Sequence, residues 1–175
     1  MKSNLPKRKP NRLPFHDYST PGAYFITICT HSRQKILSRI TKNDEYECTD
    51  PVGATIGRPH TVILSEYGKI VDQAINLIHH IYPTVTVDHY VIMPNHIHLL
   101  LQLYGGESGR PMVAPTTDRI VRQMKGYISK KIGKPIWQKL YHDHVIRNQA
   151  DYDHIWNYIE TNPARWEYDC FYENN

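Results

Sequence analysis

An apolar run that begins with two histidines, residues 90–103 (YVIMPNHIHLLLQL), constrains the fold of this chain more than any other segment. Successive side chains of a β-strand point to opposite faces, so His96 and His98 share one face while Ile97 and Leu99 share the other. The two imidazoles lie about 7 Å apart along such a strand, close enough to bind one ion. A bare His-x-His pair is also typical of hydrogen-bonded strand histidines, so the rest of the chain has to decide between the two interpretations.

The composition is typical of one soluble domain. A chain of 175 residues can bury an ordinary core without disulfides or structural metal. Cys29, Cys48 and Cys170 are odd in number and widely spaced, which predicts neither a disulfide framework nor a zinc knuckle. No apolar run reaches the length of a membrane span, and the N-terminus lacks the hydrophobic segment of a secretory signal. We therefore expect a cytoplasmic protein with no membrane partner.

Positive charge is concentrated in two places, although the net charge is only +4. The first twelve residues are rich in lysine and arginine, and residues 119–142 contain seven Lys or Arg with no Asp or Glu. Two local basic fields favour a polyanionic partner, although a solvated arm and an ordinary exposed helix face would look the same. The candidate nucleic-acid contacts in these fields are Lys7, Arg8, Lys9, Arg12, Arg122, Lys125 and Lys130.

Hydrophobic periodicity predicts an α+β domain with an antiparallel sheet. Helices are expected on one face of the sheet, which leaves His96 and His98 on an open face where nucleic acid can lie. No element is assigned to 32–50, and 136–148 are expected to pack irregularly beside the sheet. The predicted elements are a central strand at 23–30, a short strand at 61–64, a helix capped by Ser65 and ended by Pro83, a hairpin of strands 85–92 and 96–103, a helix capped by Thr117 or Asp118 and ended by Gly133, and a last helix capped by Asn148 or Asp151 that runs to about Thr161.

The same periodicity predicts which helical residues are buried and where the domain begins and ends. We expect a basic arm at 1–22, one domain at 23–166 and a tail at 167–175. The predicted apolar stripes are Tyr67, Ile70, Val71, Ala74, Leu77, Ile78 and Ile81 in the first helix, Ile120, Val121, Met124, Tyr127, Ile128 and Ile132 in the second, and Tyr152, Ile155, Trp156 and Ile159 in the last.

Tyr158 and Asn162 lie one turn apart on the flank of the last helix and can act on one spot. A boundary tyrosine and a helix-ending asparagine are the ordinary interpretation of this spacing. With His96 and His98 as two nitrogen ligands, a divalent ion would still need oxygen donors, and Asn162 can offer its amide oxygen. A tyrosine hydroxyl can attack a phosphodiester that a metal polarises and holds in line, which makes Tyr158 a candidate nucleophile.

Four segments together resemble the REP-associated tyrosine transposases, which are related to insertion-sequence transposases of the HUH endonuclease superfamily. They are DYSTPGAYFITICTHSR at 17–33, MPNHIHLLL at 93–101, WQKLYHDHVIRN at 137–148 and YIETNPARW at 158–166. The resemblance implies a ferredoxin-like domain that nicks and rejoins single-stranded DNA at hairpin-forming repeats through a 5′-phosphotyrosine. It also implies that Mg²⁺ or Mn²⁺ is bound by His96, His98 and Asn162. At the position of Asn162, the insertion-sequence relatives usually carry a glutamine ligand.

Several alternatives remain open from the sequence. Tyr141 and Tyr152 are rival nucleophiles, but Tyr158 matches the Tyr-x-x-x-Asn pattern of the family. Arg147 and Arg165 flank the last helix and can bind the scissile phosphate or pair with nearby carboxylates. An RRM-like module that binds RNA or DNA without cutting, and a domesticated relative that only binds repeats, are the alternative functions. The target repeat, the metal used, and whether the protein is a monomer or a homodimer are left undetermined.

Overall fold

The computed structural model describes residues 17–18, 20–42, 60–105 and 116–172. The basic arm with Lys7, Arg8, Lys9 and Arg12 lies outside the described residues, as does Cys48. Among the described residues, no helix combines the length and apolar character needed to cross a bilayer.

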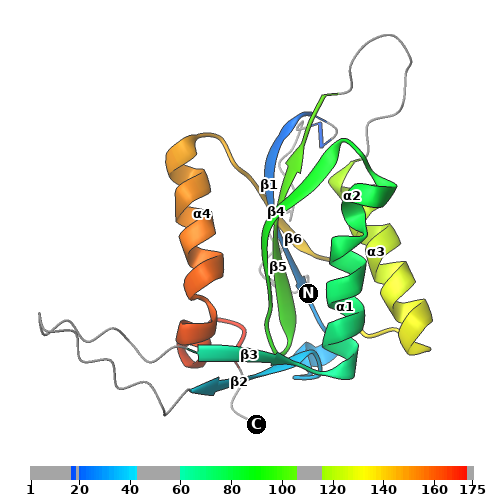
Figure 1. Cartoon of the computed structure of the whole chain (residues 1–175), viewed down its shortest axis with the longest axis vertical. Coiled ribbons are helices and arrows are strands. Elements are labelled where there is room, and N and C mark those ends of the chain that lie inside the picture. Colours follow the sequence, from blue (N-terminus) through cyan, green and yellow to red (C-terminus); the bar gives the residue numbers. More distant parts are fainter. Residues whose placement is uncertain (1–16, 19, 43–59, 106–115, 173–175) are drawn as a thin grey trace, which may run out of the picture.

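Four antiparallel strands form the central sheet in the order β4-β5-β1-β6 (Figure 1). They are β1 (Gly22–Cys29), β4 (Val85–Ile92), β5 (His96–Leu103) and β6 (His142–Val145). The helices α1 (Glu66–Asn76) and α2 (Ile78–Ile81) connect β1 to β4, and α3 (Thr117–Ile132) connects β5 to β6. This βαββαβ order with β1 in the interior of the sheet is the ferredoxin-like arrangement, which confirms the predicted fold class.

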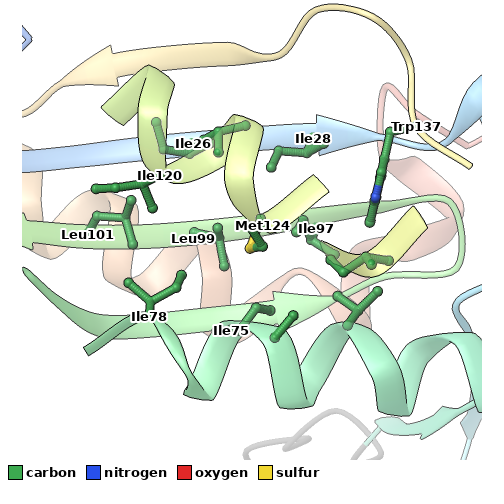
Figure 2. Packing of buried hydrophobic residues seen from close by; sticks show 14 of the residues in the cluster. Ile26, Ile28, Ile75, Ile78, Ile97, Leu99, Leu101, Ile120, Met124 and Trp137 are labelled. Carbon is green, nitrogen blue, oxygen red and sulfur yellow. The ribbon is translucent and has the colours of Figure 1, made fainter. Parts of the chain in front are cut away.

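The main core lies between one face of the sheet and α1, α2 and α3 (Figure 2). Alternate residues of β1 and β5 point into it because side chains alternate along a strand, and Ile26, Ile97, Leu99 and Leu101 are fully buried there. The helices contribute Val71, Ile75, Ile78, Ile120, Val121, Met124 and Ile128.

Four residues of the predicted helical stripes are exposed instead of buried, and one buried residue was missed. Trp156 of the last helix is 37% exposed, although its ring stacks on His89. Leu77 and Ile81 are 37% and 50% exposed because α1 ends at Asn76, and the break at Leu77 turns the following residues away from the straight-helix stripe. Tyr127 of α3 is 37% exposed at the edge of the helix pair, whereas Ile75 is fully buried.

The structure confirms most of the predicted helix ends and corrects the cap of α3. Asn148 caps the last helix by accepting from the Asp151 N–H at 2.9 Å, and that helix ends at Thr161 as predicted. Ser65 accepts a hydrogen bond from the Gly68 N–H, and Gly133 ends α3 in the left-handed conformation at φ 83°. The cap of α3 is Thr116, which accepts from the Arg119 N–H, and not Thr117 or Asp118. Thr117 is fully buried inside the first turn, so its side chain does not point back toward the helix end.

Two strands were not predicted. Residues 142–145 form β6 at the sheet edge, where alternating exposed and half-buried side chains give too weak an apolar pattern to mark a strand. Residues 38–42 form β2 (Ser38–Lys42), which pairs with β3 (His60–Leu64) in a separate two-stranded sheet. Pairing across a long connection is a tertiary contact that local composition does not encode.

Gly68 in α1 is required because its backbone passes closely over the chain before β2. A Cβ at Gly68 would overlap the backbone carbonyl oxygen of Leu37, which accepts the Ser65 N–H at 2.9 Å. We expect Gly68→Ala to lower the free energy of unfolding by about 2 kcal/mol or more, despite the higher helix propensity of alanine.

Gly126 in α3 is the matched control, because a Cβ added at Gly126 would meet open space. We expect Gly126→Ala to raise stability by about 0.5–1 kcal/mol. Urea unfolding of both variants tests this, and equal effects would contradict it.

A fourth helix, α4 (Gln149–Thr161), lies over the other face of the sheet (Figure 1). A β-bulge between Val87 and His89 brings Asp88 and His89 to this helix. Asp88 Oδ2 accepts the Tyr152 hydroxyl at 3.0 Å, and the His89 ring stacks on Trp156 at 4.4 Å between centroids. The sequence predicted that the face carrying the histidines is open. This prediction is wrong, because the last helix covers that face.

Candidate active site

His96 and His98 lie side by side beneath α4 and are almost fully buried, at 0% and 1% exposure. The alternation of β5 brings both rings to one face, as the sequence predicts, and their Nε2 atoms are 3.0 Å apart. β1 lies beside them, with Thr27 opposite His98 and Cys29 opposite His96 in the sheet register. The strand pair therefore fixes the positions of both imidazoles.

Hydrogen bonds at the outer nitrogens set the tautomer of His96 and allow either tautomer of His98. Asn95 donates its Nδ2 to the carbonyl oxygen of Phe171 at 2.8 Å, so its Oδ1 accepts from His96 Nδ1 at 2.8 Å. His96 Nε2 then carries a lone pair that faces the site. His98 Nδ1 lies 2.8 Å from the hydroxyl of Thr27, which can donate or accept and so allows either tautomer of His98. Such outer hydrogen bonds orient histidines that bind metals.

Both histidines are neutral at neutral pH. Burial lowers the pKa of His96 to about 3, and the positive charge of Arg33 adds to the decrease. Burial also holds the pKa of His98 well below its usual range; His96 adds to that decrease and Asp169 opposes it. Neutral imidazole is the form that binds a metal ion.

Tyr158 extends from α4 to the histidine pair. Its ring is 5.2 Å from that of His98 and 5.9 Å from that of Phe25, both in edge-to-face geometry. Burial raises the pKa of Tyr158 to about 12; the negative charge of Asp169 adds to the increase, and a hydrogen bond with Asn162 opposes it. The hydroxyl is therefore protonated at neutral pH.

The chain turns back after α4 and closes the site with residues that sequence reasoning missed. Through η2 (Pro163–Tyr168) it brings Asp169 and Phe171 to the histidines. The Phe171 ring lies 4.7 Å from the His96 ring, and the ligand atoms of His96, His98 and Asp169 all lie within 4.8 Å of one another. No motif marks Asp169, because it lies in the predicted tail.

Asn162 is buried at the end of α4, beside Asp169. Its Nδ2 donates to Asp169 Oδ2 at 3.0 Å, and the Phe171 N–H donates to Asp169 Oδ1 at 2.7 Å. Asn162 Oδ1 is buried without a hydrogen-bond partner in the described part of the chain. Asn162 thus adds an unpartnered buried amide oxygen beside Asp169, whose carboxylate lies near two neutral histidines, and these donor types suit a divalent cation.

Arg33 adds a positive charge at the edge of the site, and the sequence analysis did not single it out. It ends η1 (His31–Arg33), where Ser32 and Arg33 both have φ of 51°, in the left-handed region that favours glycine. Its Nη1 donates to the carbonyl oxygen of Cys170 at 3.3 Å, and its guanidinium lies 5.3 Å from the Phe171 ring centroid. A guanidinium at this position suits a phosphate group.

The other candidate residues lie in different environments. Tyr152 donates to Asp88, and Tyr141 is half-buried against the main core. Lys125 donates to the carbonyl oxygens of Gln138 and Lys139, at 2.7 and 3.2 Å, so its ammonium group serves the fold. The remaining candidates of the described residues are exposed: Arg122, which is 3.6 Å from Asp118, Lys130, Arg147 and Arg165.

Known proteins resemble this chain in fold and in sequence. The chain matches a solved structure described as a REP-associated tyrosine transposase bound to a REP hairpin, with a TM-score of 0.60 and 20% identity over 90% of this chain and 76% of the other. The two proteins share a fold. The chain is also 29% identical to a *Haemophilus influenzae* protein described only as uncharacterized, over 94% of this chain and 93% of that protein. No family model matches.

Proposed function

We propose that this protein is a REP-associated tyrosine transposase, an enzyme that nicks and rejoins single-stranded DNA at hairpin-forming repeats. The observation that carries the proposal is the meeting of His96 and His98 from β5 with Tyr158 from α4 in one buried site. A neutral histidine pair and an amide oxygen can hold a metal ion, and a tyrosine hydroxyl can serve as nucleophile, which are the two requirements of a metal-assisted phosphoryl transfer. The fold shared with a transposase that binds a REP hairpin supports the same proposal.

His96, His98 and Asn162 are the proposed ligands of Mg²⁺ or Mn²⁺. The lone pair of His96 Nε2 and the unpartnered Oδ1 of Asn162 fit this role. When bound, the ion would withdraw charge from the scissile phosphodiester and stabilise the charge of the transition state. The Thr27 hydroxyl can accept from His98 Nδ1, which frees His98 Nε2 for the ion.

Tyr158 is the proposed nucleophile. Its oxygen attacks the phosphorus, the bond between phosphorus and the 3′ oxygen breaks, and the protein becomes joined to the 5′ phosphate. The phenol loses its proton in this step and the departing 3′ oxygen gains one, so the charge balances. Attack by a DNA hydroxyl on the phosphotyrosine reverses the step and rejoins a strand. Arg33, which lies against Phe171 at the edge of the site, is the proposed partner of the phosphate.

Contacts with the rest of the DNA are proposed for the basic residues. Lys7, Arg8, Lys9 and Arg12 of the arm and the exposed Arg122 and Lys130 of α3 are suited to phosphates, with Arg147 and Arg165 near the ends of α4. Lys125 would have to release two carbonyl oxygens to join them. Such contacts position the DNA and do not read its sequence.

A binding module of the RRM type is less well supported. Such a module presents aromatic side chains on an open sheet face, where bases stack on them. Here α4 lies over that face, and Phe25, which is half-buried, packs against His98 and Tyr158. No observation in the described residues favours this alternative.

The test of the proposal is a cleavage assay on labelled single-stranded hairpin oligonucleotides drawn from repeats near the gene. We expect cleavage with Mg²⁺ or Mn²⁺, none with a chelator, and a protein–DNA adduct that survives denaturation. An oligonucleotide of equal length whose stem cannot pair is the control and should not be cut. Binding without cleavage under every metal would overturn the proposal in favour of a binding module.

A further inference from the structure

We propose that Asp169 is a ligand of the metal ion, together with His96 and His98, and that Asn162 positions this carboxylate. The inference deepens the proposed function and rests on its metal dependence. It adds a charged ligand from the chain after η2 to the pair on β5, a role that the Tyr-x-x-x-Asn pattern does not predict.

The spacing of the donor atoms supports this role. The ligand atoms of His96, His98 and Asp169 lie within 4.8 Å of one another, and the two Nε2 atoms are 3.0 Å apart. Ligands that bind one ion at about 2.1 Å lie about 3 Å apart when adjacent and about 4 Å apart when opposite. Small side-chain movements would therefore bring all three donors to one ion.

The charge of the site also favours an anionic ligand. Both histidines are neutral, so a divalent ion held by His96, His98 and an amide oxygen would carry two positive charges into a buried site that the protein itself does not compensate before DNA binds. Burying uncompensated charge is costly. The carboxylate of Asp169 offsets one of the two charges, and an amide oxygen cannot.

Asp169 is also oriented as a ligand carboxylate would be. Its Oδ2 accepts from Asn162 and its Oδ1 accepts from the Phe171 N–H, so the plane of the carboxylate is fixed from both sides. The Tyr158 hydroxyl and the Cys170 thiol also hydrogen-bond to this carboxylate, and an ion would take the place of one of these donors. Hydrogen bonds of this kind hold metal-binding carboxylates in place in other proteins. In this arrangement Asn162 Nδ2 positions Asp169, while Asn162 Oδ1 stays available as the amide ligand proposed above.

Direct titration with Mn²⁺ in the absence of DNA tests the inference, with binding followed by electron paramagnetic resonance. We expect Asp169→Asn to weaken Mn²⁺ binding at least about tenfold, as loss of a metal-site partner does. Glu167→Gln removes the same charge two residues away, from an exposed side chain, and should leave binding unchanged. Asp169→Glu keeps the carboxylate and should bind with intermediate affinity.

The possible outcomes separate this inference from the proposed function. Equal Mn²⁺ affinity of wild type and Asp169→Asn would overturn the inference alone, and Asn162 would keep the third position. Absence of Mn²⁺ binding by wild type would overturn it together with the metal dependence of the proposed function. If Asp169→Asn does not fold, as judged by circular dichroism, the comparison of wild type with Asp169→Glu decides, and equal affinity there counts against Asp169.

Discussion

Replacing Tyr158 with phenylalanine is expected to abolish the covalent protein–DNA adduct and to slow cleavage of a hairpin oligonucleotide at least about a thousandfold. The substitution removes the attacking oxygen and leaves the ring that packs on His98 and Phe25, so the fold should persist. The measurement is the rate of strand cleavage with Mn²⁺, together with the amount of adduct retained on a denaturing gel. Circular dichroism and DNA binding should match those of wild type.

The rival tyrosines provide matched controls for this experiment. Tyr152→Phe removes a hydrogen bond to Asp88 and should cost about 1 kcal/mol of stability while the adduct still forms. Tyr141→Phe should also retain the adduct, because Tyr141 packs against the main core and not against the histidines. An adduct that persists in Tyr158→Phe and disappears in one of these variants would assign the nucleophile elsewhere.

The second large effect is a loss of stability in mild acid that comes from the buried histidines. The pKa of His96 is about 3 in the folded protein against 6.5 for an ordinary histidine, and the pKa of His98 is also strongly lowered. Between these values the unfolded chain binds more protons than the folded one, so the free energy of unfolding falls as pH falls from about 6.5 toward about 3. At pH 5 His96 alone should cost about 2 kcal/mol relative to neutral pH, and His98 adds to the loss.

Urea unfolding at pH 7 and pH 5, with a chelator present so that metal binding does not contribute, measures this effect. His96→Gln should reduce the difference between the two pH values by about 2 kcal/mol. His80→Gln removes an exposed histidine of α2 and should leave the difference unchanged. Equal stability of wild type at pH 7 and pH 5 would contradict the burial of a neutral pair.

The sequence predicted the parts of the fold that depend on local periodicity. The alternation of residues 96–103 identified the strand, its buried apolar face and the pairing of His96 and His98 on the other face. The Ser65 cap and the left-handed Gly133 followed from steric and hydrogen-bonding preferences that act within a few residues. These features need no knowledge of what the segment later packs against.

The prediction failed where distant segments decide the structure. β6 has a weak alternating pattern and becomes a strand because it pairs with β1. The expectation of an open sheet face was wrong because a βαββαβ pattern does not show that a further helix covers the second face. Asp88 and His89, brought to that face by a bulge, give α4 its contacts there.

For the candidate site, the sequence by itself determined that two histidines share one strand face and that Tyr158 and Asn162 share one side of a helix, because both follow from backbone periodicity. Only the tertiary structure decided that these two pairs meet, that the histidines are buried and neutral, and that Asp169 joins them. Desolvation depends on everything that packs around a group, and the return of the chain after η2 depends on contacts with β5. Neither is encoded in the spacing of residues along the chain.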